Sequence, residues 1–174
     1  MKSLITKIKE SKSSAKHSIV LSIDIKGAFV NLNQAILKAL TESPCPRNIT
    51  TVFSNILQNR QVSIQTPTGP IIRNQAKGCP QGSCSSPALW NLVANTALNL
   101  PWQDGIHVQA FADDFAMVIK EQLKNVAQNA INEFNLWYMA NHLEMAPEKT
   151  NYIIFSTLVA PPRLTWNGVT IKKS

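Results

Sequence analysis

The apolar residues of this 174-residue chain fall into short runs that polar turn residues separate. Such runs predict β-strands and hairpins, here over residues 19–25, 61–66, 70–75, 106–119, 151–156 and 164–172. Apolar residues that recur every three or four positions predict helices, here over about 33–42, 46–57, 86–100 and 123–138. Strands and helices mix without strict alternation, which indicates an α+β domain with an antiparallel sheet and helices packed on one face.

Capping residues predict where the helices begin. Asn33 is expected to cap the first helix, and Pro46 to be the first residue of the second. Ser86 is expected to cap the third helix, with Pro87 as its first residue. Five residues form one apolar stripe along the second helix: Ile49, Val52, Phe53, Ile56 and Leu57.

Two adjacent carboxylates, Asp113 and Asp114, interrupt the apolar run over 109–119. They are expected at a tight turn between two short strands. Two like charges about 4 Å apart repel by roughly 4 kcal/mol at an effective dielectric constant of 20. A partly buried pair therefore needs a cation, and hard carboxylate oxygens suit Mg²⁺. An ordinary solvated turn is the alternative, since Asp is a common turn residue.

A third carboxylate, Asp24, stands at the carboxyl end of the strand predicted over 19–25. If that strand neighbours the acidic hairpin, Asp24 converges with Asp113 and Asp114. Three carboxylates can bridge two magnesium ions about 3.5–4 Å apart, an arrangement that supports in-line displacement at phosphorus. Phosphoryl transfer asks little of a protein beyond such placement and charge.

The formal net charge is +7, from 17 Lys and Arg against 10 Asp and Glu, and it favours contact with a polyanion such as nucleic acid. Five lysines crowd residues 1–16, where a solvated helix or tail is expected. No apolar stretch approaches the roughly 20 residues that span a bilayer, and residues 1–16 lack the apolar core expected of a secretory signal. Three cysteines without metal-ligand spacing indicate a reducing, intracellular setting.

Four blocks of the sequence resemble, in order, motifs A, B, C and D of reverse transcriptases: LSIDIKGAF (21–29), GCPQGSCSSP (78–87), FADD (111–114) and LEMAPEKTNYIIFS (143–156). The resemblance is strongest to the non-LTR retrotransposon class, and within it to arthropod elements that insert into ribosomal RNA genes. It implies a polymerase palm with partial fingers and no thumb. Residues 1–18 are then a basic stub left from the fingers connection, and 19–174 the palm with partial fingers.

The resemblance also implies a set of catalytic residues. Asp24, Asp113 and Asp114 match the metal-binding carboxylates of the family. The main-chain carbonyl of Ile25 matches a further ligand, for two Mg²⁺ ions or for Mn²⁺ in their place. Lys149 matches the motif D lysine, which protonates the pyrophosphate leaving group or steadies its charge. A plain solvated lysine is the alternative.

Other matched positions concern the nucleotide and the template. Phe29 falls at the steric gate, where a bulky ring excludes a ribose 2′-hydroxyl and favours deoxynucleotides; a core aromatic is the alternative. Gln81 and Gly82 match positions that line the pocket for the template base and the incoming nucleotide; a simple helix-entry loop is the alternative. Three basic residues flank the hairpin before motif B and are candidates for template phosphate contacts or for solubility alone: Arg60, Arg73 and Lys77.

The function that the resemblance implies is RNA-directed DNA synthesis, in which dNTPs extend a DNA 3′-hydroxyl on an RNA template. The setting is intracellular, in the nucleus for the intact element or in the cytoplasm, with no membrane partner. Val30 stands where related elements often carry Asp. Fingers and thumb are expected outside this chain, and no endonuclease or RNase H region is recognised within it. One alternative is an inactive palm-fold remnant that at most binds nucleic acid. A palm nucleotide cyclase is another, which the Pro-Gln-Gly-Ser loop does not support.

Overall fold

The computed structural model of the chain describes residues 2–14, 17–75, 77–79, 83–120, 123–156 and 162–174. The chain divides into two compact units. The larger contains residues 1–26 and 94–174, and the smaller contains residues 27–93. Among the described helices, none combines the length and the apolar character that crossing a bilayer requires.

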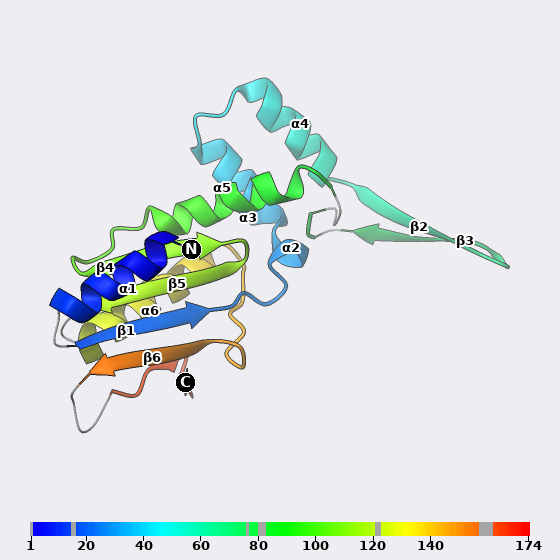
Figure 1. The fold of residues 1–174 in the computed structure, drawn as a ribbon. Coiled ribbons are helices and arrows are strands. Elements are labelled where there is room, and N and C mark those ends of the chain that lie inside the picture. Colours follow the sequence, from blue (N-terminus) through cyan, green and yellow to red (C-terminus); the bar gives the residue numbers. More distant parts are fainter. Residues whose placement is uncertain (1, 15–16, 76, 80–82, 121–122, 157–161) are drawn as a thin grey trace. The chain divides into compact units, whose positions relative to one another are not determined.

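A five-stranded sheet forms the centre of the larger unit, in the order β4-β5-β1-β6-β9 (Figure 1). The strands are β1 (His17–Ile23), β4 (Ile106–Phe111), β5 (Asp114–Lys120), β6 (Asn151–Ser156) and β9 (Lys172–Lys173). β1 is antiparallel to β5 and β6, β4 is antiparallel to β5, and β9 adds to β6 in parallel. The predicted α+β class with a mainly antiparallel sheet is therefore confirmed.

One face of this sheet is the core of the larger unit. Three side chains of β1 on this face are fully buried: Ile19, Leu21 and Ile23. Their partners on β5 are fully buried as well: Ile119, Met117 and Phe115. Helix α6 (Leu123–Ala140) covers this face, where the rings of Phe115 and Phe134 meet edge-on with centroids 4.9 Å apart. Each large apolar side chain buried in this way contributes about 1.5–3 kcal/mol.

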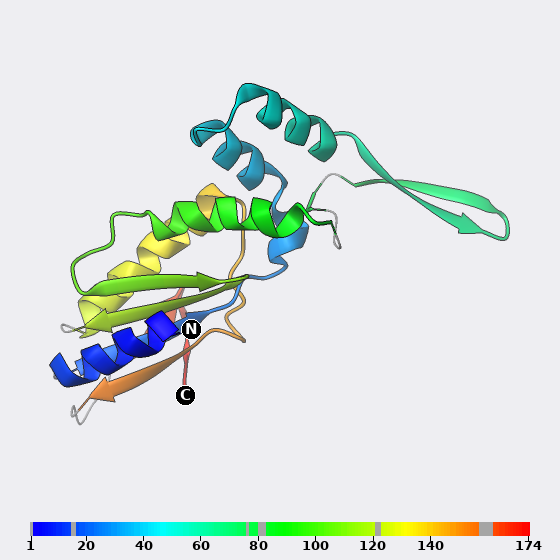
Figure 2. The same cartoon turned by 45° about the horizontal axis from the view of Figure 1, so that its top comes forward.

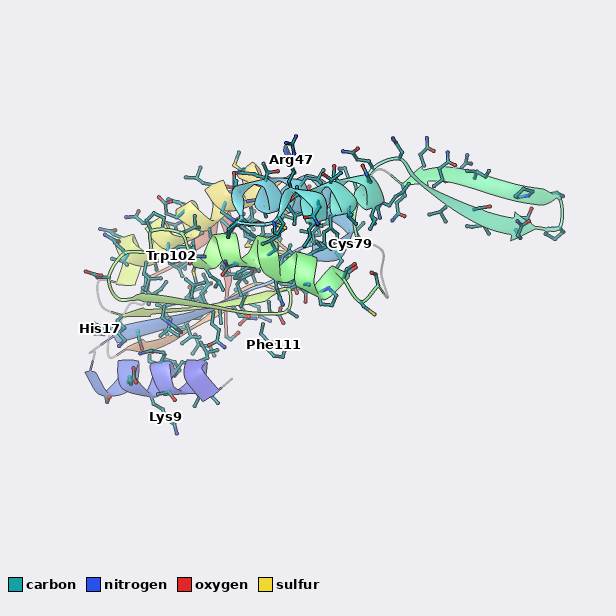
Figure 3. All side chains as sticks on the ribbon, turned by 90° about the horizontal axis from the view of Figure 1, so that it is seen from above. Lys9, His17, Arg47, Cys79, Trp102 and Phe111 are labelled. Carbon is teal, nitrogen blue, oxygen red and sulfur yellow. The ribbon has the colours of Figure 1, made fainter. Side chains whose placement is uncertain are left out.

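The basic N-terminal segment forms helix α1 (Lys2–Ser14), which packs against β1 and β5. It lies on the face opposite α6 (Figures 2 and 3). Lys9 points away from the sheet, and Lys7 pairs with Glu10 at 2.9 Å. The expectation of helices on one face thus holds for α6, and α1 adds a helix on the other.

A small C-terminal hairpin is anchored on α6. It consists of β7 (Thr165–Trp166) and β8 (Val169–Thr170), and it turns at Asn167 and Gly168, both with positive φ, as the sequence predicted. Gln128 of α6 donates from Nε2 to the carbonyl of Thr165 at 2.8 Å, and the Thr165 N–H donates back to Oε1 at 3.1 Å. This two-way bond fixes the hairpin to the helix.

The smaller unit contains helices and one hairpin. Its elements are α2 (Ala28–Asn31), α3 (Asn33–Glu42), α4 (Arg47–Leu57), β2 (Arg60–Thr66), β3 (Gly69–Gln75) and the first part of α5 (Ser86–Leu98). The hairpin agrees with the prediction. Three predicted helix starts are wrong by one residue. Ser86, expected as the N-cap of α5, is its first residue. Leu32 is the N-cap of α3 because α2 leads directly into it, and Pro46 is the N-cap of α4 instead of its first residue.

The apolar stripe predicted on α4 is mostly exposed to solvent. Ile49, Val52 and Ile56 are 41%, 54% and 51% exposed, whereas Leu57 is buried. The β2–β3 hairpin exposes apolar side chains too, among them Ile64 and Ile71, which lie opposite each other in the ladder. Helical spacing therefore identified the stripe without revealing that most of it lies at the surface.

Candidate functional site

The β1–β5 ladder sets Asp24 opposite Asp114. The last pair of the ladder is Ile23 with Phe115, so one step further along both chains Asp24 faces Asp114. Since Phe115 is directed toward α6, Asp114 is directed to the other face of the sheet. The neighbouring strands that the sequence argument required are present.

The acidic pair lies at the turn of the β4–β5 hairpin, as predicted. Phe111 pairs with Asp114, and the chain turns at Ala112 and Asp113. Ala112 has a φ of 52°, which is uncommon for a residue with a Cβ and indicates a strained turn. Phe111, the cross-strand partner of Asp114, projects to the α1 side of the sheet (Figure 3).

Negative charge accumulates at this edge. Asp114 is exposed to solvent. Desolvation by the neighbouring protein, then the charge of Asp113, then that of Asp24 nevertheless raise the pKa of its carboxyl, and Lys149 acts against them. A carboxyl whose pKa is raised by like charges gains from a bound cation. The electrostatics of the edge therefore favour a cation site.

Asp24 is held by the segment 146–150. Its N–H donates to Thr150 Oγ1 at 3.3 Å, and its carbonyl accepts the N–H of Ala146 at 3.0 Å. Lys149 Nζ lies 3.7 Å from Asp24 Oδ1, so Lys149 is no isolated surface lysine. Oδ1 is buried and accepts no hydrogen bond from any residue that the structure describes. A buried carboxylate oxygen without a donor is costly, and a divalent cation fits it.

The carbonyl of Ile25 is directed toward the acidic hairpin. On one side of Ile25, the Lys26 N–H donates to the Glu144 carbonyl at 2.8 Å, and on the other, Ala146 donates to Asp24. In an antiparallel pair, the polar groups of the residue between two such bonds point to the opposite side. The carbonyl of Ile25 therefore points toward β5, which is the side where the resemblance places a metal ligand.

The three carboxylates do not stand together as a ready-made metal site. Within the ranges that the structure describes, no three His, Cys, Asp or Glu side chains gather closely enough to hold an ion. The binding of two ions by Asp24, Asp113 and Asp114 therefore stays a prediction. Its support is the strand register and the charge at the sheet edge.

Phe29 belongs to the smaller unit, in contact with the start of motif B. Its carbonyl accepts the N–H of Cys79 at 2.8 Å, and its half-buried ring lies 6.0 Å from the ring of Trp90, centroid to centroid. Gly78 permits this approach: a Cβ there would lie 2.8 Å from the Val30 carbonyl oxygen, and its φ is +85°. The steric-gate role of Phe29 stays a prediction. Gln81 and Gly82 lie outside the described residues.

Arg60 has a structural role that the sequence argument missed. Its Nη2 donates to the carbonyl of Lys77 at 3.1 Å and to the carbonyl of Gly78. Its Nε and Nη1 are buried and have no hydrogen-bond partner among the described residues. Arg73 and Lys77 are exposed. Template contact by these three residues stays a prediction, and residues 43–103 contain no acidic side chain that would oppose it.

A protein-family model described as "Reverse transcriptase (RNA-dependent DNA polymerase)" matches residues 1–171. The chain is 30% identical over 167 residues to a "Retrovirus-related Pol polyprotein from type-1 retrotransposable element R1" of Bradysia coprophila, covering 91% of this chain and 16% of that protein. It is 26% identical over 117 residues to a "Putative 115 kDa protein in type-1 retrotransposable element R1DM" of Drosophila melanogaster, covering 67% and 11%. The chain thus spans only a small part of these relatives.

Solved structures share the fold. The telomerase of Candida tropicalis, in complex with a fragment of telomeric RNA, matches with a TM-score of 0.69 at 12% identity, over 98% of this chain and 31% of that chain. The corresponding telomerase of Candida albicans matches with a TM-score of 0.64 at 11% identity, over 98% and 32%. This likeness confirms the predicted palm-like architecture.

Proposed function

We propose that this chain, which belongs to the reverse transcriptase family, forms the palm and part of the fingers of an RNA-directed DNA polymerase from an R1-like non-LTR retrotransposon. Residues 1–18 are the basic connection toward the fingers, and 19–174 the palm with partial fingers. The DNA 3′-oxygen bonds to the α-phosphorus of a dNTP, the bond to the β-phosphate breaks, and pyrophosphate leaves. The proposal rests on one observation: the β1–β5 ladder ends with Ile23 opposite Phe115, and the same register continued brings Asp24 opposite Asp114.

The proposed cofactor is a pair of Mg²⁺ ions, with Mn²⁺ as the alternative. Asp24, Asp113, Asp114 and the carbonyl of Ile25 would hold them. When bound, such ions lower the pKa of the attacking hydroxyl and stabilise the charge on the leaving pyrophosphate. Two observations support this assignment: Asp24 Oδ1 accepts no hydrogen bond from the described residues, and the pKa of Asp114 is raised.

The chain's own groups would complete the reaction. Lys149, whose ammonium lies beside Asp24, donates a proton to the pyrophosphate. Phe29 excludes the ribose 2′-hydroxyl, and Gln81 with Gly82 lines the pocket for the base pair that forms. The proposed partners are an RNA template and a DNA end, contacted through three basic residues: Arg60, Arg73 and Lys77. The nucleus, where the target DNA lies, is the proposed site of action.

A primer-extension assay tests this function. The 174-residue chain is assayed beside a version that carries the flanking coding sequence, with a DNA primer annealed to an RNA template, dNTPs and Mg²⁺. We expect incorporation that Asp113→Asn abolishes, because the variant removes a metal-binding charge. Asp104→Asn is the matched control, since Asp104 is exposed and precedes β4.

Two results would contradict the proposal. Undiminished incorporation by Asp113→Asn would remove the catalytic role of the acidic pair. No incorporation by the longer wild-type protein, with RNA binding retained, would instead identify an inactive palm that binds nucleic acid.

A further inference from the structure

The ladder between β1 and β6 ends just before Asp24. Its last pair is Ser22 with Asn151, and the same register continued sets Asp24 opposite Lys149. At that point the opposing chain is a turn, because the N–H groups of Lys149 and Thr150 both donate to the carbonyl of Ala146, at 3.1 and 3.0 Å. Strand β6 therefore does not extend to the residues opposite Asp24, and Asp24 has no strand on this side with which to pair.

The Thr150 hydroxyl takes the place of the missing ladder acceptor. The Lys149 carbonyl, which would accept from Asp24 in a continued ladder, instead accepts from Asn151 Nδ2 at 3.2 Å. The Asp24 N–H donates to Thr150 Oγ1 at 3.3 Å, and Thr150 is only 1% exposed. A partly buried N–H needs an acceptor, and a threonine hydroxyl can supply one.

The same turn also holds the other polar groups of Asp24. Ala146 donates to its carbonyl at 3.0 Å, and the Lys149 ammonium lies 3.7 Å from Oδ1. The β4–β5 hairpin contributes Asp113 and Asp114 from a separate segment. The position of Asp24 relative to the other two carboxylates therefore depends on the β1–β5 ladder and on this turn.

We propose that Thr150 is a positioning residue for Asp24. Its hydroxyl fixes the backbone from which the short Asp24 side chain projects, and so fixes where Oδ1 meets a divalent cation. This inference rests on the proposed function, because holding a cation is what demands a fixed carboxylate. Ligands of a functional site must be held within about 0.5 Å of the productive geometry, so the loss of one backbone anchor is expected to weaken ion binding.

Three variants of the chain test the role of the hydroxyl. Thr150→Val keeps the shape of the side chain and removes the acceptor, whereas Thr150→Ser keeps the acceptor. Thr165→Val is the matched control, since Thr165 makes its hydroxyl contact with Gln128 instead. Amide hydrogen exchange at Asp24 reports the bond itself, and titration with Mn²⁺ followed by electron paramagnetic resonance reports the cation site.

In Thr150→Val, we expect the amide hydrogen of Asp24 to exchange faster than in the wild type. We also expect the variant to bind Mn²⁺ about fivefold more weakly, because one hydrogen bond supplies an effect of that size. Thr150→Ser and Thr165→Val are expected to bind Mn²⁺ as the wild type does. Unchanged exchange at Asp24 in Thr150→Val, or faster exchange without weaker Mn²⁺ binding, would overturn the proposal. If Thr150→Val does not fold, Thr150→Ser decides: because serine keeps the hydroxyl, an Mn²⁺ affinity weaker than that of the wild type in this variant would refute the role of the hydroxyl.

The two proposals can fail separately. A wild-type protein that binds Mn²⁺ through this site but incorporates no dNTP would refute the polymerase assignment and leave the role of Thr150 intact. A wild-type protein that incorporates dNTPs, with a Thr150→Val variant that binds Mn²⁺ normally, would refute only the role of Thr150.

Discussion

Lys149 Nζ lies 3.7 Å from Asp24 Oδ1, a buried oxygen that accepts no hydrogen bond from the described residues. The lysine side chain is 66% exposed, so the pair contributes little to folding stability. Both roles that the resemblance allows, proton donation and charge stabilisation, are compatible with this position.

Substitution of Lys149 separates these two roles. Lys149→Arg keeps the positive charge but does not release a proton near neutral pH, whereas Lys149→Met removes both. If the lysine donates a proton, both variants lower kcat for dNTP incorporation by about 10²-fold or more. Lys120→Met, at the far end of β5, serves as the control. Single-turnover kinetics on the same primer and template measure the effect, and wild-type rates in Lys149→Arg would show that charge alone matters.

Asp114→Asn is expected to stabilise the fold at neutral pH. Desolvation by the neighbouring protein, Asp113 and Asp24 raise the pKa of the exposed Asp114 in the folded chain above its ordinary 3.8. The folded state therefore disfavours the ionised form of Asp114. As the pH rises from about 3.8 through the raised pKa, the free energy of unfolding falls. Thermal unfolding without divalent ions should give Asp114→Asn a higher Tm than the wild type at pH 7, and the difference should shrink below pH 4.

Asp104→Asn again serves as the control, and no rise in its Tm is expected. A lower Tm for Asp114→Asn at pH 7 would mean that the Asp114 carboxylate makes a favourable interaction that outweighs the repulsion.

Local pattern predicted those parts of the fold that depend on neighbours in sequence. The apolar alternation before Asp24 and the run around the acidic pair predicted β1 and the β4–β5 hairpin, because the side-chain period of a strand is visible within a few residues. The order of the motifs identified the family. Local pattern could not predict the pairing of β1 with β5, because tertiary packing sets the register between strands that are distant in sequence.

The features that the sequence argument missed are long-range contacts. Thr150 bonds to a residue 126 positions away, and Arg60 reaches carbonyls 17 and 18 positions further on. Nothing in the periodicity of α4 distinguished a buried stripe from an exposed one. One local signal was available at Gly78, because a glycine that opens a polar loop often marks a close approach of two backbones.

Gly78→Ala is expected to destabilise the smaller unit. The residue has a φ of +85°, and a Cβ would lie 2.8 Å from the Val30 carbonyl oxygen and 2.9 Å from that of Phe29. Both obstacles are backbone atoms, which cannot rotate away. Gly69→Ala is the control, because Gly69 also has a positive φ but a Cβ there meets nothing within 4 Å.

Urea unfolding measures the difference between the two glycine variants. Gly69→Ala should cost about 1 kcal/mol, the strain of the backbone conformation alone. Gly78→Ala should cost clearly more, because the steric clash adds to that strain. Equal costs would show that the loop moves away from Phe29 and Val30 without penalty.

Arg73→Gln is expected to weaken RNA binding through loss of one phosphate contact. Arg73 is exposed on β3 opposite Val62, within a stretch, 43–103, that contains no acidic residue. Each lost phosphate contact reduces the slope of log affinity against log salt by about 1, with little dependence on sequence. Fluorescence anisotropy with two unrelated RNA oligonucleotides at several salt concentrations measures this slope. Arg163→Gln, at another exposed arginine in the larger unit, is the control. An unchanged slope in Arg73→Gln would mean that the hairpin contributes charge for solubility and does not contact the template.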